Sequence, residues 1–154
     1  MKNAVNRILA RGVAMKNKKV IIPVIYALLA TVVLVLACGN PAQEKAAQEH
    51  VDAGHSYYAQ KQWDMAIAEY TKAIELRTKL AEAYWGRGLA YYYKEDYDKA
   101  IVEYTAAIEA DPNYARAYYQ RAIAYLQKGD YDKAQPDFDK AVELQSKVVE
   151  SQSK

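Results

Sequence analysis

Residues 81–114 read AEAYWGRGLAYYYKEDYDKAIVEYTAAIEADPNY, and the same pattern recurs before this stretch at positions 47–80 and after it at positions 115–148. Five columns recur in register, each with one residue type: an aromatic residue, an aspartate, an alanine, a second aromatic residue and a second alanine. These columns are Trp63, Tyr97 and Tyr131; Asp64, Asp98 and Asp132; Ala66, Ala100 and Ala134; Tyr70, Tyr104 and Phe138; Ala73, Ala107 and Ala141. A fixed period of this length predicts a repeat array whose units pack on their neighbours.

Each unit is predicted to be two antiparallel helices joined by a tight turn. In the first half of the stretch, Tyr84, Gly88 and Tyr91 have the i, i+4, i+7 spacing of one helix face. KEDY separates the two halves, and KGDY replaces it in the third unit, where Gly129 suits the left-handed residue that ends a helix. Asp111 and Pro112 are expected to begin the next helix as its cap and first turn.

Small residues share two columns, which predicts close contact between the two helices of a unit. A bulky side chain there would overpack the contact, at a typical cost of about 1–3 kcal/mol. The columns are Gly54, Gly88 and Ala122 in the first helices, and Ala66, Ala100 and Ala134 in the second.

At these residues the chain resembles the tetratricopeptide repeat family. The family pattern asks for a large residue at position 4 of a unit, small residues at 8, 20 and 27, aromatic residues at 11 and 24, and often proline at 32. The matches are Gly54, Tyr57, Ala66, Tyr70 and Ala73; Tyr84, Gly88, Tyr91, Ala100, Tyr104, Ala107 and Pro112; Tyr118, Ala122, Tyr125, Ala134, Phe138 and Ala141. His50 and Thr78 depart from the pattern.

The resemblance implies an all-α fold, a right-handed α-solenoid of three helix-turn-helix repeats after an N-terminal signal or anchor segment. The repeats are expected at 47–80, 81–114 and 115–148, followed by a C-terminal tail at 149–154. Pro136 lies several residues into the last helix, so that helix is expected either to begin late, near Asp132, with Pro136 tolerated in its first turn, or to kink.

The N-terminal residues 1–37 differ from the repeats. They hold six basic residues and no acidic one, and Val20 to Ala37 form an uncharged apolar run. Such a segment is typical of a secretory signal peptide. A run of this length is also just long enough for an uncleaved transmembrane anchor. Met15 is a more natural start than Met1 because the basic lead-in before the apolar run is long.

Cys38, the only cysteine, follows the apolar run directly. The sequence VLAC resembles the lipobox of bacterial lipoproteins, which implies lipidation of Cys38, cleavage before it, and a short linker at 38–46. An uncleaved anchor and a bystander cysteine are the alternatives. In both leading interpretations the basic flank stays in the cytoplasm, so the repeats are expected on the extracytoplasmic side of the membrane.

The whole chain carries 21 basic and 19 acidic residues, for a net charge of +2. Without residues 1–37 it keeps 15 basic and 19 acidic residues, a net charge of −4. The expected mature protein is mildly acidic, so nucleic acid is not an expected partner.

No catalytic set, cofactor motif or metal-ligand pattern is expected. His50 and His55, the two histidines, are five residues apart and so diverge by about 140° around a helix. His50 occupies a packing column and is expected to be a satisfied core or interface residue. The sequence therefore favours a non-enzymatic protein without a cofactor.

The family resemblance also implies that the first helices of successive units line a concave groove. The residues expected to bind a partner there are Tyr58, Trp85, Leu89, Tyr92, Tyr93, Arg116, Tyr119 and Ile123. Trp85, Tyr92, Tyr93 and Tyr119 are expected to form one aromatic cluster with Tyr58 at its side, because aromatic residues dominate interface hot spots. The alternative is that these tyrosines only pack.

Chaperone-binding members of the family grip a terminal carboxylate with lysine, asparagine and arginine side chains. At the matching positions this chain has Val51, His55, Gly86, Arg116 and Gln120. Only Arg116 fits, so recognition of a C-terminal carboxylate is not expected.

The sequence thus predicts a lipid-anchored adaptor of the bacterial cell envelope that holds a peptide or helix of another envelope protein in its groove. Two alternatives stay open. One is a structural component that self-associates through its uncapped last helix, and the other is an accessory protein with a small molecule in the groove.

Overall fold

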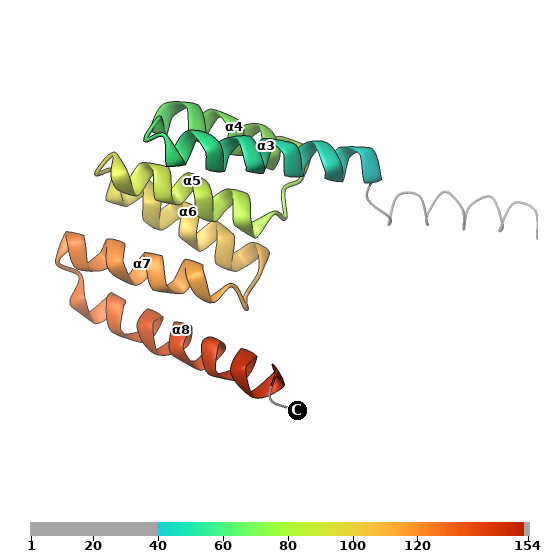
Figure 1. Cartoon of the computed structure of the whole chain (residues 1–154). Coiled ribbons are helices and arrows are strands. Elements are labelled where there is room, and N and C mark those ends of the chain that lie inside the picture. Colours follow the sequence, from blue (N-terminus) through green and yellow to red (C-terminus); the bar gives the residue numbers. More distant parts are fainter. Residues whose placement is uncertain (1–39, 153–154) are drawn as a thin grey trace, which may run out of the picture. The chain divides into compact units, whose positions relative to one another are not determined.

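The computed structural model describes residues 40–152, in which all regular structure is helical. Six helices follow one another along these described residues (Figure 1). They are α3 (Pro41–Ala59), α4 (Trp63–Leu76), α5 (Ala81–Tyr93), α6 (Tyr97–Ala110), α7 (Ala115–Lys128) and α8 (Tyr131–Gln152). The predicted signal segment, the apolar run and Cys38 lie outside the described residues.

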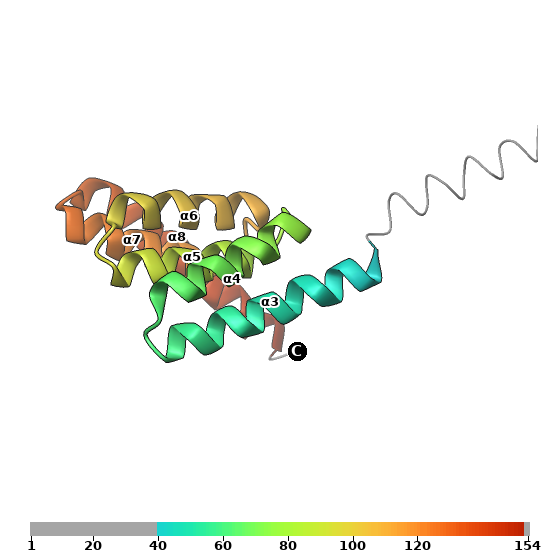
Figure 2. The same cartoon turned by 90° about the horizontal axis from the view of Figure 1, so that it is seen from above.

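The helices form three pairs, α3 with α4, α5 with α6 and α7 with α8, and each pair packs on the next. Figures 1 and 2 show the pairs stacked in chain order. This arrangement confirms the predicted all-α solenoid of three helix-turn-helix units. Helix α3 begins at Pro41, so residues 41–46 of the predicted linker are helical, and α8 continues to Gln152 through part of the predicted tail.

The core depends on one tyrosine in each of the first two units. Tyr70 and Tyr104 are fully buried and lie against glycines of neighbouring first helices. A Cβ atom at Gly54 or at Gly86 would come within 2.5 Å of the Tyr70 ring, and one at Gly88 within 2.6 Å of the Tyr104 ring. The small residues predicted from the repeat therefore let the helices approach, as expected.

The turn inside each unit places a residue in the left-handed region. Lys61, Glu95 and Gly129 occupy the same repeat position, with φ of 60°, 62° and 80°. Gly129 ends α7 as a left-handed cap, as predicted.

Two predictions about prolines and caps were wrong. Asp111 ends α6 rather than starting α7, and its carboxylate accepts a hydrogen bond from the Asn113 backbone within the turn. Helix α8 begins at Tyr131 because the Asp130 carbonyl already accepts from the backbone N–H groups of Lys133 and Ala134. Pro136 is therefore inside the helix, beyond the first turn, and only its missing N–H interrupts the backbone ladder.

Polar contacts recur where one unit meets the next, and we call each such interface a joint. At the first joint Arg87 donates from Nη1 to Thr71 Oγ1 of the preceding unit (3.0 Å), while its Nη2 donates to Glu103 Oε2 of its own unit (2.9 Å). At the second joint Arg121 donates to Thr105 Oγ1 of the preceding unit (3.0 Å) and, with two nitrogens, to Asp137 of its own unit (2.7 and 2.8 Å).

An ion pair also crosses each joint nearer the surface. Lys94, the residue that follows α5, pairs with Asp64 of α4, and Lys128 of α7 pairs with Asp98 of α6. Each joint therefore places an arginine of the incoming first helix, and a lysine seven residues later at the end of that helix, against the preceding unit.

The Arg87–Glu103 pair predicts a pH dependence of stability. Burial raises the pKa of Glu103 and outweighs the lowering by the hydrogen bond from Arg87. Because the pKa of Glu103 is higher in the folded protein than in the unfolded chain, protonation of Glu103 stabilises the fold. This contribution to the unfolding free energy is complete below the ordinary glutamate pKa of about 4.3 and is lost as pH rises through the raised pKa.

We therefore expect the unfolding free energy of the original protein, relative to Glu103→Gln, to fall as pH rises from the ordinary glutamate pKa of about 4.3 through the raised pKa of Glu103. Urea unfolding of both proteins across this range measures the difference. A difference that grows with pH would mean that the attraction of Arg87 outweighs burial.

Candidate partner-binding site

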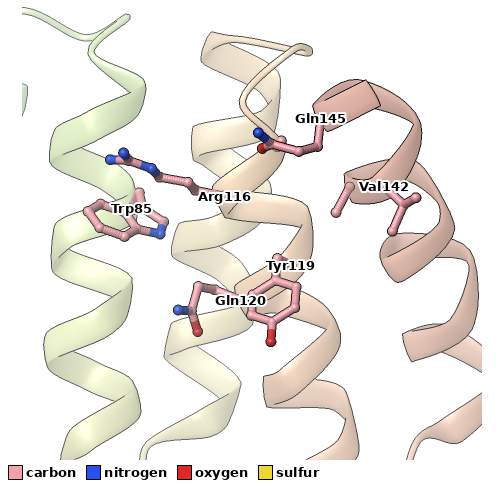
Figure 3. Close-up of a pocket in the computed structure, with 8 residues that line it drawn as sticks. Trp85, Arg116, Tyr119, Gln120, Val142 and Gln145 are labelled. Atoms are coloured by element: carbon pink, nitrogen blue, oxygen red, sulfur yellow. The ribbon is translucent and has the colours of Figure 1, made fainter. Parts of the chain in front are cut away.

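A pocket of about 420 Å³ opens where α5, α7 and α8 approach one another. Figure 3 shows Trp85 on α5, three labelled residues on α7 and two on α8 around the hollow. The lining residues are Trp85, Ala115, Arg116, Tyr119, Gln120, Ala141, Val142 and Gln145. Apolar atoms dominate this lining, which is the character of a surface that binds an apolar side chain or a helix face.

Contacts with aromatic rings position the pocket residues. The Arg116 guanidinium carbon lies 5.7 Å from the Trp85 ring centroid. The Tyr114 ring meets Trp85 edge-on at 6.2 Å, and Tyr119 meets Phe138 edge-on at 5.5 Å. Trp85 is half-buried, and its Nε1 is buried without a hydrogen-bond partner among the described residues.

The pocket is nearly neutral. Arg116 is the only charged residue in its lining. Behind the pocket, burial raises the pKa of Tyr114, and burial likewise raises the pKa of Tyr70 and Tyr104 in the core. These three phenols therefore stay protonated at neutral pH.

The predicted single aromatic cluster was wrong, because the structure forms two. Tyr93 stacks on Trp63 at 5.1 Å and meets Tyr58 edge-on at 5.7 Å, while Tyr92 lies 5.3 Å from Tyr97. Trp85 and Tyr119 belong to the pocket instead. Seven residues separate Trp85 from Tyr92, which is about 10.5 Å along a helix axis, too far for one cluster of rings.

The remaining predicted groove residues lie elsewhere. Leu89 is buried with Tyr104 in the core, and Ile123 is half-buried outside the pocket lining. Gly86 was expected in the groove but faces the Tyr70 ring. Of the eight predicted partner-binding residues, the structure brings Trp85, Arg116 and Tyr119 together.

Helix α8 contributes pocket residues that the groove prediction missed. Ala141, Val142 and Gln145 belong to a second helix, whereas the family pattern directs attention to first helices. The signal was present in the repeat: Val142 occupies the column of Ile74 and Ile108, which is the column that meets the following unit.

The histidines form structural contacts. His50 Nδ1 lies 2.7 Å from Glu69 Oε2, and His55 Nε2 lies 3.9 Å from Glu82 Oε1. Within residues 40–152 no group of three metal-ligating side chains is present. In the same range no helix is both long and apolar enough to cross a membrane.

The family is established by sequence. The pattern described as a TPR repeat matches residues 54–95 and again 88–129, and the pattern described as the tetratricopeptide repeat matches residues 115–147. These matches cover more than half of the chain, which therefore belongs to the tetratricopeptide repeat family. No curated protein matches the chain.

Solved structures with the same fold include MamA, which is 33% identical over 70% of this chain and 63% of that chain, with a TM-score of 0.65. The TPR2B domain of yeast Sti1, in a complex with pHsp70, is 29% identical over 71% and 87% of the two chains, with a TM-score of 0.67. The second TPR of Spaghetti, bound to an HSP90 peptide, is 27% identical over 68% and 99%, with a TM-score of 0.65.

The chain spans less than two thirds of the length of the MamA chain. Its fold is that of a protein-interaction scaffold, which is generally not catalytic, and two of these neighbours are complexes with peptide partners. The chain thus belongs to a family of protein-interaction scaffolds.

Proposed function

We propose that this protein is a lipid-anchored adaptor of the bacterial cell envelope that binds a segment of another envelope protein. The observation that carries the proposal is the pocket lined by Trp85, Arg116, Tyr119 and Val142. It combines aromatic surface with one cation, and such features recur at interface hot spots. Val51 and Gly86 are buried, so a terminal-carboxylate clamp has no donors there, and an internal segment is the proposed ligand.

The membrane part of the proposal comes from the sequence. Six basic residues precede the apolar run from Val20 to Ala37, and Cys38 follows it in the order of a lipoprotein signal. Two or three acyl chains would hold the protein stably at a membrane, since each buried methylene adds about 0.8 kcal/mol. The repeats would then lie on the extracytoplasmic side.

Replacing Cys38 with serine should leave an unprocessed precursor and abolish labelling by a fatty-acid analogue, because the thiol is the attachment atom. Gel mobility and acyl labelling in the native host measure both effects. Unchanged mobility, with membrane attachment retained, would favour the alternative of an uncleaved anchor formed by residues 20–37.

Partner binding is tested by the double variant Arg116→Ala and Tyr119→Ala. Both side chains are exposed, so we expect partner capture from membranes to fall at least tenfold while the unfolding midpoint stays nearly unchanged. Met65→Ala is the control, because Met65 is 48% exposed, close to the 51% of Tyr119, but lies outside the pocket. Equal capture by all three proteins would refute binding at this pocket.

A self-associating structural component is the second candidate. Val142 and Val149 of α8 are exposed, and apolar exposure of this kind favours association. Molecular mass measured over a range of concentrations separates the candidates, because an adaptor stays at one mass without its partner.

A further inference from the structure

The outer side of α8, the last helix of residues 40–152, carries a row of uncharged side chains that we call the end face. The row consists of Tyr131, Gln135, Val142, Gln145 and Val149, and all five are exposed. In the column of Val142, Ile74 is 9% exposed and packs in one cluster with Ala83 and Ala90 of the following first helix, whereas Val142 is 69% exposed. Ile108, the third member of this column, is half-buried at the second joint.

The end face also repeats the acidic side of a joint. Asp132 occupies the column of Asp64 and Asp98, which pair with Lys94 and Lys128. Within the described part of the chain, Asp132 forms no ion pair.

The end face has a different residue at the position of the threonine that accepts from the arginine at each joint. Asp139 stands in the column where Thr71 and Thr105 accept a hydrogen bond from the arginine of the following helix. Asp139 accepts only from Gln135 of its own helix, at 2.9 Å. A carboxylate in this place would bind an incoming arginine more strongly than a hydroxyl does, because the hydrogen bond would be charge-assisted.

We propose that the end face docks a helix of the partner protein, with an apolar stripe and two basic residues seven positions apart, in the place of a next first helix. This inference rests on the proposed adaptor function and specifies the chemistry of the partner. Residues seven apart lie on nearly one face of a helix, about 10.5 Å apart along its axis. The basic pair would meet Asp139 and Asp132, and the apolar stripe would cover Tyr131 and Val142 and fill the pocket at Tyr119.

A second copy of this chain fits the end face less well. In a head-to-tail pair α3 would take the place of the next first helix, but α3 has Ala53 and the turn after it has Gln60 in the arginine and lysine columns. The basic pairs of α5 and α7 are already bound at their own joints.

The experiment uses the full chain in detergent and a capped peptide with the sequence of residues 115–128, ARAYYQRAIAYLQK. In the folded protein this sequence forms α7, which packs on α6 at the second joint. It carries Arg121 and Lys128, seven positions apart. Fluorescence anisotropy should show binding that weakens at least tenfold when both of these residues in the peptide are replaced by glutamate. Binding of the unmodified peptide should also weaken as salt is added, a test that needs no protein variant.

The matching protein variants reverse the charge of the end face. Asp132→Lys with Asp139→Lys should bind the glutamate peptide at least tenfold better than the original peptide. Val142→Glu should abolish binding, whereas Val102→Glu, at a valine that is 65% exposed on α6, should not. Affinities that do not respond to charge reversal on either side would overturn the inference, and so would equal effects of the two valine changes.

The outcomes separate this inference from the adaptor function. If Arg116→Ala with Tyr119→Ala loses the native partner while the aspartate variant keeps it, the adaptor function stands and the end-face inference fails. If both variants keep the partner, both proposals fail. A dimer of the unmodified chain that the peptide dissociates would identify a second copy as the occupant and would overturn the assignment to a partner helix.

Discussion

Replacing Tyr104 with alanine should lower the free energy of unfolding by about 3–5 kcal/mol, as large-to-small changes of buried aromatic residues do. Tyr104 is fully buried, its ring lies against the backbone of Gly88, and it packs with Leu89, Ala100 and Ala124 between the second and third units. The cavity would open at the joint that holds the third unit. Urea unfolding followed by circular dichroism measures the change.

Two controls separate the packing of the buried Tyr104 ring from the effect of its hydroxyl group and from the loss of any tyrosine side chain. The Tyr104 hydroxyl is buried without a hydrogen-bond partner among the described residues, so Tyr104→Phe should change the unfolding free energy by less than about 1 kcal/mol. Tyr131→Ala, at an exposed tyrosine, should stay within about 0.5 kcal/mol. A loss at Tyr131 equal to that at Tyr104 would mean that the core has been assigned wrongly.

The second large effect is expected at the Arg121–Asp137 pair. Asp137 is the buried charged residue of the described chain, and Arg121 binds it through Nε and Nη2 at 2.7 and 2.8 Å. The hydrogen bond to Asp137 also raises the pKa of Arg121. Arg121→Met would leave a buried carboxylate unpaired and should cost about 3–5 kcal/mol of unfolding free energy.

A second substitution tests that explanation. Arg121→Met with Asp137→Leu should recover most of the loss, because two apolar side chains remove the uncompensated charge. Lys128→Met, which breaks the exposed pair with Asp98, should cost less than about 1 kcal/mol. If the double variant is as unstable as the single one, the arginine acts through its packing or through its hydrogen bond to Thr105 rather than through charge.

The fold was predictable because each repeat places the same residue types in the same columns. Ala66, Ala100 and Ala134 are all buried, as their small size at one column required. The first residue of α8 was less predictable than the repeat columns. The start of α8 depended on the Asp130 carbonyl, a backbone contact that the position of Pro136 does not reveal.

The candidate site was predictable in part. Trp85, Arg116 and Tyr119 are three of the predicted groove residues, and all three line the pocket. Tyr92 and Tyr93 lie at the other end of α5, where the Tyr93 ring stacks on Trp63 and the Tyr92 ring contacts Tyr97. Which neighbours a groove residue meets depends on its level along the helix axis. The family resemblance predicts the face of the helix but not the neighbours at each level.

The central claim is that a partner protein binds at the pocket between α5, α7 and α8. A photo-crosslinking amino acid at Tyr119 in cells that carry the anchored protein tests it most directly, with the same residue at the exposed Val102 of α6 as the control. We predict one dominant crosslinked protein of the envelope from Tyr119 and none from Val102. Crosslinks to the same protein from Val102 but not from Tyr119 would contradict the claim and place the binding surface elsewhere on the array.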